Sequence, residues 1–263
     1  MATLDITALE SFGFRFGDGG THLARTMMFD DVARVLQELG PCPNKEQVVN
    51  AVDRENLLGK PSGEARRLAT RHLVRLYSFD RTEIIYRALT FLWERCPDSQ
   101  RLLALLCAYA RDPLLRHCTR FLLEMREGQA YDRDKLSEFV EDQFAGRYSP
   151  VMLTSVAQRL AGTWTQSGHL QGRSKKKRVL VTPTPGAVTF ALLLGYLNGN
   201  RGILNFESEY VKLLDCSPTT AIELAKTAAR RGWVDVKHVG SVVEVAFPRI
   251  LTEQELEAIR EQG

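Results

Sequence analysis

The sequence contains few cysteines and none of the cysteine spacings that bind metals. Five of the 263 residues are Cys, an odd number, and no two stand in a CxxC spacing. Neither a disulfide framework nor a zinc site is therefore expected. The first ten residues, MATLDITALE, contain two acids and lack the apolar core of a secretory signal. We expect a cytoplasmic protein with reduced thiols, no metal and no cofactor.

A long apolar run is also missing. Residues Val179 to Leu197 (VLVTPTPGAVTFALLLGYL) are nineteen positions without a charge, but two of them are prolines. The continuous apolar part, Ala187 to Leu197, is about half of the roughly 20 residues that a membrane-spanning helix needs. This stretch therefore predicts a buried core helix, and no membrane is expected as a partner.

The motifs of common enzymes are absent as well. The glycine-rich FGDGGTHLART (Phe16 to Thr26) lacks P-loop spacing and predicts a turn that leads into the first helices. Asp235 and Lys237 have the D-x-K spacing of some nucleases, but such a site needs carboxylates from neighbouring strands, and this pair lies in a short hairpin. The five histidines are scattered, and none is spaced with a nucleophile or metal ligand. We expect no enzymatic activity and no catalytic residues.

The most informative absence is that of acids. No Asp or Glu occurs from Gln143 to Phe206, whereas this window contains eight cations, five of them in the six positions from Arg173 to Arg178. The window thus carries a charge of +8, and because the whole chain carries +3, the remainder carries −5. Such an asymmetry favours a phosphate backbone, an anionic membrane surface or an acidic protein as the partner.

Residues 1–130 are predicted to form an all-helical region. Apolar residues recur at spacings of three and four in five stretches, as is typical of amphipathic helices. These stretches are Asp30–Leu39, Lys45–Val52, Ala65–Leu76, Arg81–Glu94 and Ser99–Ala110. In the third stretch, Arg67, Arg71 and Arg75 are spaced by four and share one helix face. That face is either an ordinary solvated surface or a second phosphate-contacting surface, in which Arg67 and Arg71 contact DNA.

The rest of the chain contains two repeats with the same order of elements: helix, turn, helix, strand, loop, strand. In each repeat a Ser-Pro pair, Ser149-Pro150 or Ser217-Pro218, predicts the start of the second helix. Gly168 and Gly232 predict its end, and a hairpin follows. This order indicates a winged helix-turn-helix. We therefore predict a mainly α protein, with the helical region at 1–130 followed by tandem winged helix-turn-helix units at 131–185 and 186–263.

The second helix of each repeat is the expected recognition helix. In the first repeat, Val156, Leu160 and Trp164 are spaced for the core, and in the second repeat the predicted core residues are Ile222, Leu224 and Ala228. Trp164 and Trp233 are expected to be buried under the hairpins. The return strands of the hairpins are predicted at Val179–Val181 in the first repeat, and at Val242, Val243, Val245 and Phe247 in the second.

Basic and polar residues at the tips and outer faces of these elements are the candidate DNA contacts. The segment Arg173-Ser-Lys-Lys-Lys lies at the expected tip of the first hairpin, where phosphates pass in a winged helix. The candidates are Ser155, Gln158, Arg159, Arg173, Lys175, Lys176, Lys177 and Arg178 in the first repeat and Lys226 and Arg230 in the second. The second repeat also carries Glu223 and Glu244, so we expect it to bind DNA less well.

Three stretches resemble a known family. They are DRENLLGKPSGEARRLATRHL (Asp53 to Leu73), LLALLCAYARDPLLRHCTRFLLE (Leu102 to Glu124) and VAQRLAGTWTQSGHLQGRSKKKRV. In the order of elements over most of the chain, they are similar to the BrxA family of BREX bacteriophage-defence systems. The resemblance implies a small, cytosolic, largely helical DNA-binding accessory without catalytic activity, encoded beside a methyltransferase and an ATPase. The second winged unit, at about Glu207 to Pro248, departs from the family pattern.

The sequence therefore predicts a non-enzymatic component of a BREX-type phage-defence system that binds double-stranded DNA, with other defence subunits as further partners. Two alternatives stay open: a transcription factor that regulates its own operon, and a protein-interaction scaffold of the defence complex. RNA is less favoured as a ligand, because no aromatic-rich stacking surface alternates with the basic residues.

Overall fold

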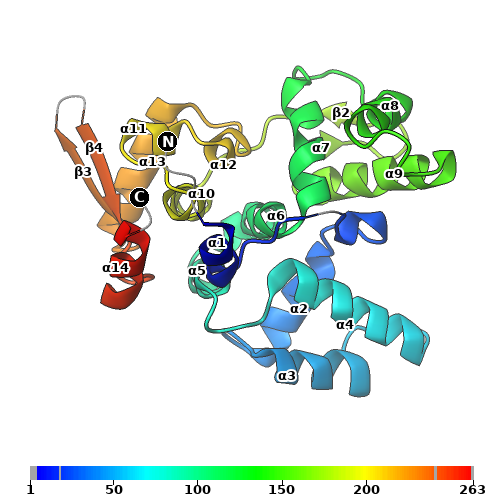
Figure 1. Ribbon diagram of the computed structural model, residues 1–263, viewed down its shortest axis with the longest axis horizontal. Helices are drawn as coiled ribbons and strands as arrows, with labels where there is room; N and C mark the ends of the chain where they lie inside the picture. The colour runs from blue at the N-terminus through cyan, green and yellow to red at the C-terminus, as the bar shows by residue number, and fades with distance from the viewer. Residues whose placement is uncertain (1–4, 18, 240–241, 262–263) are drawn as a thin grey trace. The chain divides into compact units, whose positions relative to one another are not determined.

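The computed structural model describes residues 5–17, 19–239 and 242–261. Most of these residues are helical, and the sheet in this part of the chain consists of two short antiparallel hairpins, β1–β2 and β3–β4 (Figure 1). The predicted mainly α class is confirmed. The chain divides into two compact units, each assembled from segments that are distant in the sequence. Unit 1 contains Met1–Arg15, Asp80–Leu106 and Thr182–Gly263, and unit 2 contains Phe16–Phe79 and Cys107–Val181.

Unit 1 is built around helix α10 (Pro185–Leu197), which packs against α5, α12 and α13. The other elements of this unit are α1 (Ile6–Phe12), α5 (Ile84–Arg95), η3 (Pro97–Ser99), the first part of α6 (Gln100–Arg111), α11 (Ile203–Phe206), α12 (Glu209–Lys212), α13 (Pro218–Arg230), β3 (Asp235–Val239), β4 (Val242–Ala246) and α14 (Glu253–Glu261). All of α10 except Pro185 and Tyr196 is buried, so the charge-free stretch forms the predicted core helix. Within the described ranges, every helix is too short or too polar to cross a bilayer.

Unit 2 contains the acid-free hairpin and the helices around it. Its elements are η1 (Thr21–Leu23), α2 (Phe29–Leu39), α3 (Lys45–Val49), the π-helix η2 (Asn50–Arg54), α4 (Gly63–Tyr77), the end of α6, α7 (Pro113–Glu124), α8 (Arg133–Gln143), α9 (Pro150–Gln166), β1 (Leu170–Gln171) and β2 (Lys177–Arg178). Helices α8 and α9 lie side by side (Figure 1), and β1 contacts α9. Residues 1–130 contribute to both units, and the division after Val181 lies close to the boundary that was predicted at residue 185.

The Ser-Pro pairs begin α9 and α13 as predicted. Ser149 Oγ accepts a hydrogen bond from Met152 N at 3.3 Å, and Ser217 Oγ accepts one from Thr220 N at 3.1 Å. In both helices the following proline is the first helical residue, where its missing N–H has no intrahelical partner to lose. Gly168 and Gly232 have φ angles of +93° and +71° and end the two helices in the left-handed region.

The register of the first hairpin differs from the prediction. The return strand was expected at Val179–Val181, but β2 is Lys177–Arg178, which pairs with β1. An unpredicted third segment explains the shift: Gln129 O accepts from Arg178 N, and Tyr131 N donates to Lys176 O, both at 2.9 Å. Because β2 is hydrogen-bonded on both sides, the charged residues form the central strand of a small sheet. In the second hairpin, β4 contains Val242, Val243 and Val245 as predicted, and Phe247 follows it.

The core of α9 was predicted correctly, whereas that of α13 was predicted correctly only at Ala228. Val156, Leu160 and Trp164 are each fully buried, and Trp233 is 6% exposed. In α13 the fully buried residues are Ala221, Ala225 and Ala228, while Ile222 and Leu224 are half-buried. The three alanines form a narrow strip that lets α13 approach α10 closely. The prediction chose Ile222 and Leu224 for their larger apolar side chains and missed Ala221 and Ala225, which line the buried face together with Ala228.

Candidate nucleic-acid interface

The basic hairpin, which we define as residues Leu170–Arg178, presents three exposed cations: Arg173, Lys175 and Lys177. Gly172 makes its tight turn possible, because its φ is +117° and an added Cβ would lie 2.2 Å from the carbonyl oxygen of Lys175. Lys176 is half-buried, and its Nζ donates to Thr165 Oγ1 at 2.7 Å. This bond ties the tip of the hairpin to the last turn of α9.

Arg178 does not belong to the exposed surface. It is 2% exposed, and its guanidinium donates to the carbonyl oxygen of Val179. The cause is the alternation of side chains along a strand: Lys177 points outward, so Arg178 points inward. The structure therefore removes Arg178 from the candidate DNA contacts and leaves its neighbours.

The outer face of α9 carries polar side chains that are wholly or partly exposed to solvent. Gln158 is exposed, Ser155 and Thr165 are half-buried, and Val151 at the start of the helix is 78% exposed. Arg159 lies at the edge of this face, where it is half-buried and donates to the carbonyl oxygen of Leu23. Burial and the positive charge of Arg25 lower the pKa of Arg159. Gln158 is thus more accessible to a partner than Arg159.

One flank of α9 is covered by a segment that the sequence did not predict there. Residues 23–29 run beside the helix: Thr163 Oγ1 accepts from Met27 N at 2.8 Å, and Gln166 Oε1 accepts from Phe29 N at 3.2 Å. Gly162 permits this approach, since an added Cβ would lie 2.8 Å from Thr26 Cγ2. The small residues Gly162 and Thr163 were the available signal for this close approach.

Helix α4 presents the predicted arginine face within the same unit. Arg67, Arg71 and Arg75 are exposed, and Ser62 caps the helix by accepting from Ala65 N at 3.1 Å. Arg66 is instead half-buried and donates to the carbonyl oxygen of Asp53 at 2.7 Å. Both α4 and α9 contact η1. The arginine face and the basic hairpin therefore belong to one compact body.

The candidate residues of α13 have partners of their own. Lys226 Nζ pairs with Glu223 Oε1 at 2.8 Å, and Arg230 donates to Thr227 Oγ1 at 3.0 Å. In the neighbouring hairpin, Lys237 is directly opposite Glu244. Opposite charges across a strand pair attract each other and offset each other's field. The charges of α13 and of its hairpin are therefore partly offset by neighbouring acids.

A buried polar network in unit 2 has the residue types of a catalytic triad. His22 Nδ1 lies 2.9 Å from Asp112 Oδ2, and His22 Nε2 lies 2.8 Å from Thr163 Oγ1. All three side chains are at most 1% exposed, so a substrate cannot reach the hydroxyl group. Asp112 also caps α7 by accepting from Leu115 N at 3.0 Å. The network thus connects η1, α7 and α9 in the core, and its role is structural.

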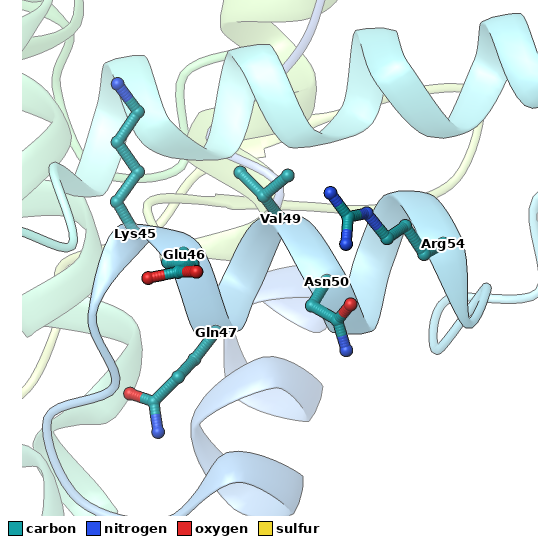
Figure 2. A pocket seen from close by; sticks show the side chains of 6 residues that line it. All are labelled: Lys45, Glu46, Gln47, Val49, Asn50 and Arg54. Atoms are coloured by element: carbon teal, nitrogen blue, oxygen red, sulfur yellow. The ribbon is translucent and has the colours of Figure 1, made fainter.

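Figure 2 shows a pocket of about 660 Å³ along α3 and η2, where the side chains of Lys45 and Gln47 point in opposite directions. Gln47 is occupied in a capping box with Asn44, whose N donates to Gln47 Oε1 at 2.8 Å. The side chains that line this pocket do not converge on a common point. The described side chains also bring no three His, Cys, Asp or Glu residues together as metal ligands.

Comparison with models of known protein families, with curated proteins and with solved structures finds no match for the chain. The resemblance to the BrxA family therefore stays a prediction from the sequence. Function has to be inferred from the charge and geometry of the described surfaces.

Proposed function

We propose that the chain is a non-enzymatic protein that binds double-stranded DNA through the basic hairpin and the open face of α9. The single observation that carries this proposal is the group of exposed cations Arg173, Lys175 and Lys177, held next to α9 by the bond from Lys176 to Thr165. These cations lie in the part of the sequence that contains no acid. Phosphates are the partner for such a surface, since neutralising them releases condensed counterions.

The order of elements supports a winged helix-turn-helix around this hairpin. Helix α7 is followed by the extended segment at residues 128–131, then by α8, α9 and the strands β1 and β2. In this architecture the helix before the hairpin enters the major groove, and the hairpin lies along the backbone. Ser155 and Gln158 on α9 are then placed to contact base edges or phosphates, whereas the hairpin cations contact phosphates.

A similar order, with α11 inserted between α10 and α12, precedes the hairpin β3–β4 in the second repeat. Because cations of the second repeat are paired with acids, this repeat is less suited to binding phosphates than the first. Ile203 and Leu204 on α11 and Val242 on β4 are exposed by 41%, 58% and 68%, and α11 contacts β4. Exposed apolar side chains on two contacting elements favour a protein partner. We propose that this repeat contacts other subunits of the complex rather than DNA.

In biological terms, we propose a cytoplasmic component of a BREX-type phage-defence system, with double-stranded DNA and other defence subunits as partners. A scaffold without DNA binding is the second candidate, which the exposed apolar residues of the second repeat favour. Stable co-purification with partner subunits and no salt-sensitive DNA shift would support the scaffold. A footprint on a palindromic promoter of its own operon would instead identify an autoregulatory transcription factor.

The proposal predicts unequal effects of two matched double substitutions. Lys175→Ala with Lys177→Ala and Lys226→Ala with Arg230→Ala each remove two cations from the protein. We expect the first pair to weaken duplex binding by roughly ten- to a hundredfold at low salt, because two phosphate contacts are lost. The second pair should change affinity by less than about threefold, since its only effect on DNA is a small change in the overall field.

Fluorescence anisotropy with a labelled duplex at fixed ionic strength measures both variants. The substitutions are used in the full chain because each unit contains distant segments: a cut near Pro185 would separate α10 from α5, against which it packs. Equal losses for the two pairs would show that the hairpin is not the DNA-contacting element.

A further inference from the structure

Arg25 occupies a position between the two basic surfaces of unit 2. It is exposed and follows η1, which contacts both α4 and α9. It also lines a cavity of about 470 Å³ together with Ala65 and Ala69 of α4 and Gln166 of α9. The side chain of Arg25 therefore lies at the place where these two helices approach the same segment of the chain.

Besides burial, the charge of Arg25 lowers the pKa of one residue on α9 and of one residue on α4. On the α9 side, burial and Arg25 lower the pKa of Arg159. On the α4 side, burial and the charges of Arg25, Arg71 and Arg75 lower the pKa of His72, against the opposing effect of Asp112. One exposed arginine thus lies within electrostatic range of residues on two helices, and it connects the arginine face of α4 with the edge of α9.

This cluster of cations has little compensation from acids. Within the described part of the chain, Arg25, Arg71, Arg75 and Arg159 take part in no ion pair. Asp112 is buried and bound to His22, while Asp31, which lines the cavity beside Arg25, is paired with Lys60 at 2.9 Å. Of the two acids that line the cavity, Asp30 is the exposed one. Like charges held together without counterions repel one another, and a bound anion relieves that repulsion.

We propose that Arg25, Arg71, Arg75 and Arg159 form one phosphate-binding surface that extends the DNA contact from α9 to α4. The inference rests on the proposed function, because it assigns the phosphates to the duplex that the basic hairpin binds. It adds a second point of contact, remote in sequence from the hairpin, in which Arg25 is the link. Helix α4 is then a DNA-contacting helix, and its arginine face is not an ordinary solvated surface.

The test compares Arg25→Ala with Arg34→Ala in the full chain. Both residues are exposed arginines of unit 2, and both substitutions remove one charge, but Arg34 lies on α2 and does not line the cavity. We expect Arg25→Ala to weaken binding of a labelled duplex by about tenfold at low salt and to reduce the slope of log K against log salt by about 0.9. Arg34→Ala should leave both values nearly unchanged. The double variant Arg71→Ala with Arg75→Ala should reduce the slope by about twice as much as Arg25→Ala.

Two negative results are possible, and they distinguish a failure of this inference from a failure of the proposed function. If Arg25→Ala and the α4 variant bind like Arg34→Ala, while Lys175→Ala with Lys177→Ala is weakened, the α4 surface does not touch DNA and the hairpin still does. If the unsubstituted chain does not bind duplex DNA at low salt, both the proposed function and this inference are overturned. Melting curves of the variants confirm that the exposed substitutions have left the fold intact.

Discussion

Replacing Asp112 with Ala is expected to destabilise the protein by about 3 to 5 kcal/mol, because it leaves buried donors of His22 and Leu115 without their acceptor. Asp112 is buried and accepts from His22 N, His22 Nδ1 and Leu115 N. The substitution removes all three interactions at the centre of unit 2. Gly20 shows how closely the chain packs there, since an added Cβ would lie 2.0 Å from Asp112 Oδ1. Chemical denaturation at neutral pH measures the loss.

Asp132→Ala is the matched control for this experiment. Asp132 is also an N-cap aspartate, accepting from Asp134 N and Lys135 N at the start of α8, but it is exposed and has no buried histidine beside it. Losing an exposed cap costs about 1 kcal/mol. If Asp112→Ala costs no more than Asp132→Ala, the buried pair contributes nothing beyond the cap.

The pH dependence of the same network has a definite sign. Burial by itself raises the pKa of Asp112, but His22 and the bonds from Leu115 and His22 outweigh burial, so that the pKa is lowered. A lowered pKa in the folded state stabilises the fold above the pKa of the unfolded chain, and this stabilisation is lost as the pH falls through the folded value. The difference in stability between the protein and Asp112→Asn should therefore shrink in acid.

Reversing the three exposed charges of the basic hairpin is expected to abolish DNA binding. With Arg173, Lys175 and Lys177 all replaced by Glu, three attractive contacts become repulsive, and affinity at low salt should fall by about a thousandfold or more. The fold should be nearly unaffected, because exposed substitutions away from caps and networks change stability by about 0.5 kcal/mol or less. Duplex binding and thermal melting of this variant measure the two effects.

A second charge-reversal variant distinguishes the local charge of the basic hairpin from the net charge of the whole protein. Reversing Lys226, Arg230 and Lys237 changes the net charge by the same amount in the second repeat, which we propose to lie away from DNA. Binding that survives this change but not the reversal in the hairpin identifies the hairpin as the contact. Equal loss in both variants would mean that only the overall field matters.

Helices α2 to α6 were predictable because their signals are local, whereas α1 and α7 were not among the predicted stretches. Apolar spacing placed α2, α4, α5 and α6 within three residues of their observed ends. The caps of α9 and α13 were equally clear, since Ser-Pro at the start and Gly at the end act within one turn. Such signals need no knowledge of what the helix packs against.

The candidate site depended on contacts between residues that are distant in sequence, and there the predictions were less accurate. Arg178 is buried because side chains alternate along β2, and the pairing of β2 with residues 128–131, which no feature of the hairpin sequence indicates, places Arg178 in that strand. Arg159 stays a candidate, but its position is set by its bond to the carbonyl oxygen of Leu23, more than a hundred residues away, which the sequence did not indicate. Arg25 was not recognised because its importance comes from η1, which lies between α4 and α9. Basic residues can be counted from a sequence, but their accessibility is decided by tertiary packing.

The salt dependence of duplex binding by the full chain tests the central claim most directly. Affinity would be measured by anisotropy from about 50 mM to about 200 mM salt, a range in which phosphate contacts are strongly weakened. Three hairpin cations on phosphates predict a slope of log K against log salt of about −2.7, and contacts from Arg25 and α4 make it steeper. A slope near zero, or no binding at the lowest salt, would contradict the account.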